Sequence, residues 1–427
     1  MRASLLIRKA LPIARRRARW LVRPPRVRGS LPPPFPGGGR IAEAEELAAV
    51  EAVREVLRSK RLFRYGGPLP RSRAARLEKS FAAAMGARHA LALNSGTSAL
   101  VCALAAMEVG PGDEVIVPAF TWISTATAVL DVGATPVIAE VDASLTLDPD
   151  DARAKLSPRT RAIVPVHMRG APAAMDRIVD LAEQHGLLVL EDAAQAVGAS
   201  FRGRRLGTIG HAGAYSFHMA KVITAGEGGM LVTGDAALHR RAAMHHDPGA
   251  PVHLGVSAEE WRTGLNFRMS ELQAAVALVQ LERLDELLRD MRASKRRLKE
   301  LTGGPLRARG VEFRTLHDAD GDAAVALVFF LPDAARTERV VSALADQNVP
   351  AGRLCRDGRD HPHDYVDLHA YPYWTPLVKD VERPEGACPR TMALLRRAVH
   401  VDVSPDLTAA QVEQMAAAVV SVVEEHI

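Results

Sequence analysis

Cysteine is scarce in this 427-residue chain, and aromatic residues make up only 4% of it. The three cysteines are Cys102, Cys355 and Cys388, and no two of them form a Cys-x-x-Cys pair. Neither a disulfide framework nor a cysteine zinc site is therefore supported. A reducing compartment suits this cysteine usage best, so we expect a cytoplasmic protein.

Long hydrophobic runs are also lacking. No apolar run reaches the ~18 residues that span a bilayer. Basic residues interrupt the apolar stretch near the N-terminus, which makes a secretory signal a poor match. Hydrophobic residues make up 48% of the chain and charged residues 25%, as in ordinary globular proteins. At about 150 residues per domain, the length predicts two or three domains. The lack of a long apolar run predicts no membrane insertion.

Acidic residues are absent from the first 30 positions, which hold ten lysines and arginines. The rest of the chain has 45 basic and 50 acidic residues, so the net charge of +5 belongs to the tail. A basic tail can bind nucleic acid, anionic lipid or a protein, or act as a transit peptide. Its proline- and glycine-rich end has little to pack, so we expect residues 1–40 to be a disordered leader that binds no nucleic acid.

From residue 41 onward, short apolar runs alternate with helical stretches. The expected strands cover residues 89–94, 113–118, 135–141, 161–167, 187–192, 213–217 and 229–233. This alternation predicts an α/β fold with a mostly parallel seven-stranded sheet that carries helices on both faces. Residues 270–301 are expected to form one long helix.

The composition changes near residue 304. Expected strands at 325–330 and 399–403 alternate there with helices at 333–347 and 409–427. We therefore expect an N-terminal helix and large domain over residues 41–303, and a smaller C-terminal α+β domain over residues 304–427.

Three motifs follow expected strands. Asn94-Ser95-Gly96-Thr97-Ser98 opens a helix whose dipole and small residues suit a phosphate, although an ordinary capped turn has the same pattern. Asp192 ends a buried strand, where parallel sheets bind ligands, although it could instead cap a helix. Lys221 precedes a glycine-rich turn and is well placed to bind an aldehyde, although a lone lysine usually lies on the surface. Together, an anion cradle, a carboxylate and an amine match the needs of pyridoxal 5′-phosphate (PLP).

Four long motifs support this interpretation. They are LNSGTSAL, DEVIVPAFTWISTATAV, LEDAAQAVGASFRGRRLGTIGHAGAYSFHMAKVITAGEGG and LNFRMSELQAAVALVQLERLDE. With them, the chain from about residue 41 to its end resembles the DegT-type (DegT/StrS) sugar aminotransferases, which are PLP-dependent transferases of fold type I. The segments at 62–65, 166–168 and 265–268 are most similar to the branch that aminates a keto-octulosonate.

The resemblance implies roles for individual residues. Lys221 would bind PLP covalently, Asp192 would pair with the pyridine nitrogen, and Gln195 would lie near the phenolic oxygen. The remaining cofactor contacts would be Gly96, Thr97 and Ser216 at the phosphate, Trp122 stacked on the ring, and Asn266 reaching the phosphate from a second subunit. Asn266 thus implies a homodimer with shared active sites. The weaker substrate candidates are Arg268, His167 and Arg169.

The expected reaction moves an amino group from glutamate or glutamine to a keto sugar or a related cyclic ketone. An aromatising synthase of the aminohydroxybenzoate type remains an alternative. A sugar dehydratase is another, although those relatives typically carry histidine at the position of Lys221. A non-enzymatic binding role of the basic tail is the third. We expect no metal site, because His361, His363 and His369 lie in a proline-rich segment with few acids nearby.

Removal of residues 1–34 should leave the kinetic constants and the oligomeric state unchanged. Ordering this tail would cost about 1–2 kcal/mol of backbone entropy per residue with little apolar burial in return. Steady-state kinetics and isoelectric focusing on a protein that begins near Phe35 would test this, and its isoelectric point should fall. Loss of PLP or of activity would show instead that the tail completes the site.

Overall fold

The computed structural model describes residues 43–66, 71–250, 252, 255–355 and 388–427. The expected leader over residues 1–40 lies outside these described residues, as do His361, His363 and His369. Among the helices that the structure describes, none is long and apolar enough to cross a membrane.

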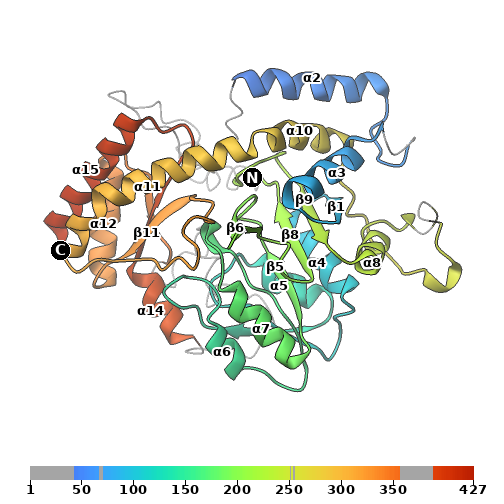
Figure 1. Cartoon of the computed structure of the whole chain (residues 1–427), viewed down its shortest axis with the longest axis horizontal. Coiled ribbons are helices and arrows are strands. Elements are labelled where there is room, and N and C mark those ends of the chain that lie inside the picture. The colour runs from blue at the N-terminus through green and yellow to red at the C-terminus, as the bar shows by residue number, and fades with distance from the viewer. Residues whose placement is uncertain (1–42, 67–70, 251, 253–254, 356–387) are drawn as a thin grey trace, which may run out of the picture. The chain divides into compact units, whose positions relative to one another are not determined.

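A seven-stranded sheet forms the centre of the fold (Figure 1). Its strands, in spatial order, are β1 (His89–Leu93), β9 (Gly229–Thr233), β8 (Ala212–Ser216), β5 (Leu188–Asp192), β4 (Thr160–Ile163), β2 (Glu114–Pro118) and β3 (Thr135–Ala139). β9 pairs antiparallel with both of its neighbours, whereas every other pairing is parallel. The mostly parallel seven-stranded sheet expected from the sequence is thus confirmed.

Helices connect the parallel strands. From β2 to β3 the chain moves toward one edge of the sheet, and from β4 to β5 it moves toward the other edge. Because both crossovers are expected to be right-handed, their helices lie on opposite faces of the sheet. The helices are α2 (Glu43–Ser59), α3 (Arg73–Met85), α4 (Gly96–Ala106), α5 (Ser124–Asp131), α6 (Pro149–Ala154), α7 (Met175–His185), α8 (Ala236–His246), α10 (Glu271–Glu282), α11 (Leu284–Ala308), α12 (Ala334–Asp346), α14 (Pro389–Arg397) and α15 (Ala409–His426). Two short strands, β6 (Ser200–Phe201) and β7 (Arg204–Arg205), form a separate hairpin.

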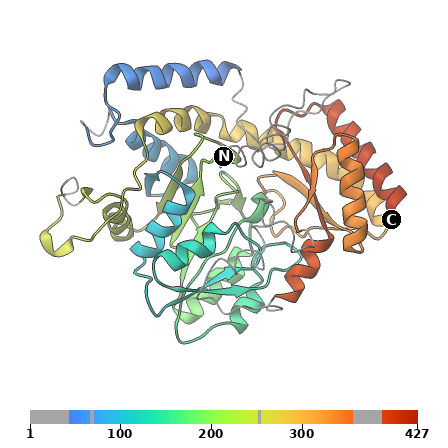
Figure 2. The same cartoon turned by 180° about the vertical axis from the view of Figure 1, so that it is seen from behind.

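A second, antiparallel sheet follows in the C-terminal part of the chain. Its order is β10 (Glu312–Phe313), β11 (Ala326–Phe330), β13 (Ala398–Asp402) and β12 (Ala351–Arg353). The same elements are seen from behind in Figure 2. Helix α11 runs through residue 304, so the expected division into domains at this position stays a prediction.

The single long helix expected over residues 270–301 is wrong in one respect. The structure has two helices, α10 and α11, which meet at Arg283 with φ −97° and ψ 0°. Just after this junction, Leu284 and Leu288 pack tightly against Gly198. A purely local pattern does not contain this contact, which depends on a segment far away in the sequence.

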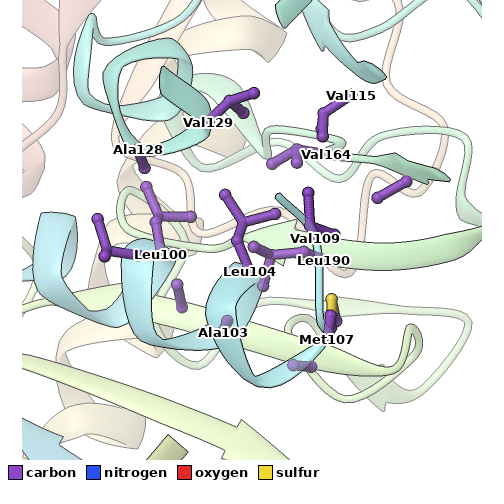
Figure 3. Close-up of a cluster of buried hydrophobic side chains, with 14 of the residues drawn as sticks. Leu100, Ala103, Leu104, Met107, Val109, Val115, Ala128, Val129, Val164 and Leu190 are labelled. Carbon is purple, nitrogen blue, oxygen red and sulfur yellow. The ribbon is translucent and has the colours of Figure 1, made fainter. Parts of the chain in front are cut away.

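Helix α4 is buried on nearly all sides, as its mostly apolar sequence requires. Its first turn is capped by the Ser95 side chain, which accepts a hydrogen bond from the Ser98 N–H. In the core around it, Leu100 and Leu104 lie near Val129 of α5 and Leu190 of β5 (Figure 3). This packing fixes the beginning of α4 at the edge of the sheet where the candidate site lies.

The substitution Leu104→Ala should lower the free energy of unfolding by about 2–5 kcal/mol, because Leu104 is fully enclosed and a cavity would remain. The exposed Leu62→Ala is the matched control and should cost far less. Chemical denaturation of both variants measures the difference. Equal losses would contradict this placement of the core.

Candidate active site

Asp192 ends strand β5 at the carboxyl edge of the sheet, and only 5% of its surface is exposed. Its Oδ2 accepts a hydrogen bond from the Thr125 hydroxyl at 2.7 Å, and its Oδ1 accepts one from the Ala194 N–H at 3.1 Å. A buried carboxylate needs such donors. An ionised carboxylate has about four acceptor positions, so Asp192 can also pair with a protonated ring nitrogen.

Lys221 follows the end of β8 and is half-buried. Burial lowers the pKa of its amine, the nearby charge of Asp192 raises it, and that of Arg169 lowers it, with a net decrease. A lower pKa leaves more of the amine neutral near pH 7, which is the nucleophilic form. The fold thus brings the amine of Lys221 and the carboxylate of Asp192 into one electrostatic environment.

Gly96 and Ser216 meet where the start of α4 reaches the end of β8. A Cβ atom added at Gly96 would lie 2.8 Å from the Ser216 Cβ, so only glycine allows this approach. Ser216 is buried, whereas Thr97 is exposed and donates its hydroxyl hydrogen to Ser124 Oγ at 2.9 Å. Hydroxyls beside a helix N-terminus suit a phosphate group.

Gln195 and Trp122 form hydrogen bonds with residues of the neighbouring loops. Gln195 Oε1 accepts a hydrogen bond from the Arg169 N–H at 3.0 Å. The carbonyl of Trp122 accepts one from the Thr125 N–H at 3.0 Å, which links Trp122 to the hydroxyl partner of Asp192. Sequence reasoning did not single out Thr125. Its four-residue spacing from Thr121, whose hydroxyl lies 2.7 Å away, was the available signal.

Asn266 and Arg268 lie on a neighbouring segment. Asn266 is exposed, and its carbonyl oxygen accepts a hydrogen bond from Asn94 Nδ2 at 3.5 Å. The Arg268 guanidinium pairs with Asp247 and lies over the Phe63 ring, 5.2 Å from its centroid. Arg268 thus already has a carboxylate partner, which weakens its candidacy for a substrate carboxylate.

The expected role of His167 as a substrate residue requires a correction. Its side chain is fully buried, and both ring nitrogens bond within the fold. Nδ1 accepts a hydrogen bond from the Ala173 N–H at 3.1 Å, so Nε2 carries the proton and donates it to Glu191 Oε2 at 3.0 Å. These contacts give His167 a structural role and leave it no atom for a substrate.

Glu191 precedes Asp192 and faces the opposite side of the sheet, because side chains alternate along a strand. It is fully buried and accepts hydrogen bonds from three backbone N–H groups, those of Gly207, Ile209 and Gly210, at 2.6–2.7 Å. Glu191 therefore holds the loop before β8. Strand alternation could have assigned the two neighbouring carboxylates to different tasks from the sequence.

Among the described residues, no group of three or more His, Cys, Asp or Glu side chains is arranged to hold a metal ion. The polar groups at this edge are instead an amine, a buried carboxylate with spare acceptor positions, and hydroxyls at a helix start. Such a set is compatible with an aldehyde-bearing, phosphorylated pyridine cofactor such as PLP.

Comparisons with known proteins agree with this chemistry. A model described as the DegT/DnrJ/EryC1/StrS aminotransferase family matches residues 43–420. GDP-perosamine synthase of Caulobacter vibrioides is 46% identical over 214 residues, which are 49% of this chain and only 57% of that protein. Spore coat polysaccharide biosynthesis protein SpsC of Bacillus subtilis is 35% identical over 81% of this chain and 88% of its own. The crystal structure of an aminotransferase from Psychrobacter cryohalolentis superposes with a TM-score of 0.80 at 30% identity, covering 92% of this chain and all of that one.

The substitution Glu191→Gln should lower the free energy of unfolding by about 3 kcal/mol, because one buried acceptor oxygen becomes a donor that faces N–H groups. The exposed Glu183→Gln on α7 is the control and should change it by less than about 0.5 kcal/mol. Denaturant titration reads both values. A Glu191→Gln protein as stable as the control would show that Glu191 does not hold this loop.

Proposed function

The chain belongs to the DegT/DnrJ/EryC1/StrS family of PLP-dependent aminotransferases, and we propose that it transfers an amino group from an amino acid to a keto sugar. One observation carries this proposal. Asp192 ends β5, and β5 pairs in parallel with β8, whose end carries Ser216 and is followed by Lys221. The start of α4 meets the same strand end through the close approach of Gly96 to Ser216. This is the arrangement that a cofactor with an aldehyde, a ring nitrogen and a phosphate requires.

Each matched residue has a task in the proposal. When bound, PLP supplies an electron sink for the carbon that loses a proton. Lys221 Nζ would hold the cofactor through its aldehyde carbon, and its amine would carry the proton to and from the substrate carbon. Asp192 keeps the pyridine nitrogen protonated. The remaining contacts are Gly96, Thr97 and Ser216 at the phosphate, Trp122 over the ring and Gln195 at the phenolic oxygen.

The nature of the substrates is the finer part of the proposal. The names of the two curated relatives concern perosamine and a spore coat polysaccharide, which supports a sugar acceptor. Glutamate or glutamine is the proposed donor. The segments at 62–65, 166–168 and 265–268 favour a keto-octulosonate as acceptor. In a direct screen, protein loaded with amino groups from each donor is offered nucleotide-linked keto sugars and keto-octulosonates, and the aminated product is identified by mass spectrometry.

The purified protein should be yellow, and borohydride should fix the cofactor to Lys221, as peptide mass spectrometry would show. The substitution Lys221→Ala should slow the spectral change that L-glutamate causes by about 10²–10⁴-fold, because the proton-transferring amine is lost. Lys79→Ala, an exposed lysine of α3, is the matched control. A Lys221→Ala protein that reacts at nearly the wild-type rate would refute the assignment.

The proposed active unit is a homodimer in which Asn266 reaches the neighbouring subunit's cofactor phosphate. Its exposed position supports this proposal, as do the exposed apolar residues Leu47, Val50 and Leu57 along α2. Apolar patches of this kind often mark protein interfaces.

The substitution Asn266→Ala should raise the dissociation constant of PLP about tenfold, because a hydrogen bond to a charged group is lost. The stability of the cofactor-free protein should change little, since the side chain is exposed. Equilibrium dialysis and sedimentation measure cofactor retention and the oligomeric state. A wild-type protein that is fully active as a monomer would contradict the shared site.

A further inference from the structure

Arg169 occupies an unusual backbone conformation next to the candidate active site. It has φ 53° and ψ 37° in the short turn Met168–Gly170, a left-handed conformation that few non-glycine residues adopt. Its N–H donates to Gln195 Oε1, and a Cβ atom added at Gly170 would lie 2.9 Å from the Ala323 Cβ. The turn is therefore held between two segments, and the direction of the Arg169 side chain is fixed with it.

The Arg169 guanidinium is charged but poorly hydrogen-bonded. Its NH1 lies 3.7 Å from Asp402 Oδ1, which is an ion pair beyond hydrogen-bond distance. Its Nε is buried and has no hydrogen-bond partner among the described residues. About a fifth of the side chain remains accessible. Asp402 itself accepts a hydrogen bond from His400 Nδ1 at 3.0 Å, so this carboxylate keeps a partner if Arg169 turns away.

Two other arginines near the site do donate hydrogen bonds from their guanidinium groups. Arg314 donates to the carbonyl oxygens of Ser144 and Met168. Arg268 forms a hydrogen-bonded ion pair with Asp247. Of the three guanidinium groups, that of Arg169 is the one that makes no hydrogen bond to the described residues.

The turn that carries Arg169 lies beside Asp192, because the His167 N–H donates to the Asp192 carbonyl oxygen at 3.1 Å and the Arg169 N–H donates to Gln195 Oε1. The charge of Asp192 raises the pKa of Lys221 and that of Arg169 lowers it. In the proposed reaction, Lys221 removes a proton from the donor carbon that bears both the amino group and a carboxylate. That carboxylate must lie within a few ångströms of Lys221, where a planar guanidinium can bind it through two parallel hydrogen bonds.

We propose that Arg169 binds the carboxylate on the reacting carbon of the amino donor, and that Asp402 is the resident counterion which this carboxylate replaces. The inference rests on the proposed function and adds the residue that selects amino acids as donors. Asp402 acts as a positioning residue, because its ion pair with Arg169 orients the guanidinium before the substrate carboxylate binds.

Unreactive probes separate binding from turnover. Glutarate is L-glutamate without its amino group, and butyrate lacks in addition the carboxylate of the reacting carbon. Calorimetry on the PLP-loaded protein should show that Arg169→Gln raises the dissociation constant of glutarate about 10–100-fold and leaves that of butyrate nearly unchanged. Arg169→Lys should also raise it, because a lysine lacks the fork of donors. Asp402→Asn should lower it severalfold, because no resident carboxylate competes.

The matched control is Arg177→Gln, an exposed arginine of α7 paired with Asp150, which should bind glutarate as the wild type does. Wild-type affinity for glutarate in Arg169→Gln would overturn the inference. If Arg169→Gln does not fold, Arg169→Lys and Asp402→Asn provide the test. The inference would be overturned if the dissociation constant of glutarate changed in the same direction in both variants, or changed in neither. Borohydride fixation at Lys221 is measured in every variant. Its failure in the wild type would refute the proposed function, whereas intact fixation with unchanged glutarate binding would refute only the role of Arg169.

Discussion

Two neighbouring carboxylates, Glu191 and Asp192, end the central strand β5, and both are buried. Burying either one without donors would cost several kcal/mol. The alternation of side chains along the strand sends them to opposite faces, so two separate sets of donors must exist. Backbone N–H groups of the loop before β8 and the ring of His167 serve Glu191, and Thr125 at the start of α5 serves Asp192. This requirement ties the loops around β5 to one another.

The candidate active site depends on the same requirement. The loop that Glu191 holds leads into β8, whose end carries Ser216 and, a few residues later, Lys221. The close approach of Gly96 to Ser216 then joins the start of α4 to that end. An amine, a carboxylate and a helix start, far apart in the sequence, thus gather at one edge of the sheet. Glu191, which holds a loop, and Asp192, the proposed partner of the cofactor, are thus neighbours in the chain that face opposite sides of the sheet.

Much of this arrangement could be predicted from the sequence. Short apolar runs separated by helical stretches indicated the parallel sheet, and the motifs around Asp192 and Lys221 indicated the cofactor. The break between α10 and α11 could not be predicted from the local pattern, and the residues that follow it pack against Gly198, which is distant in the sequence. The structural role of His167 and the unused donors of Arg169 likewise depend on partners that are distant in the chain. Residue type and spacing define which chemistry is possible, whereas tertiary contacts decide which donors remain free.

At the end of β5, Asp192 is proposed to keep the ring nitrogen of PLP protonated. Protein reconstituted with PLP labelled with nitrogen-15 in the ring allows the protonation of that nitrogen to be read from its NMR chemical shift. The nitrogen should be protonated in the wild type and deprotonated in Asp192→Asn, in which the anionic partner is lost. The same chemical shift in both proteins would contradict this role of Asp192.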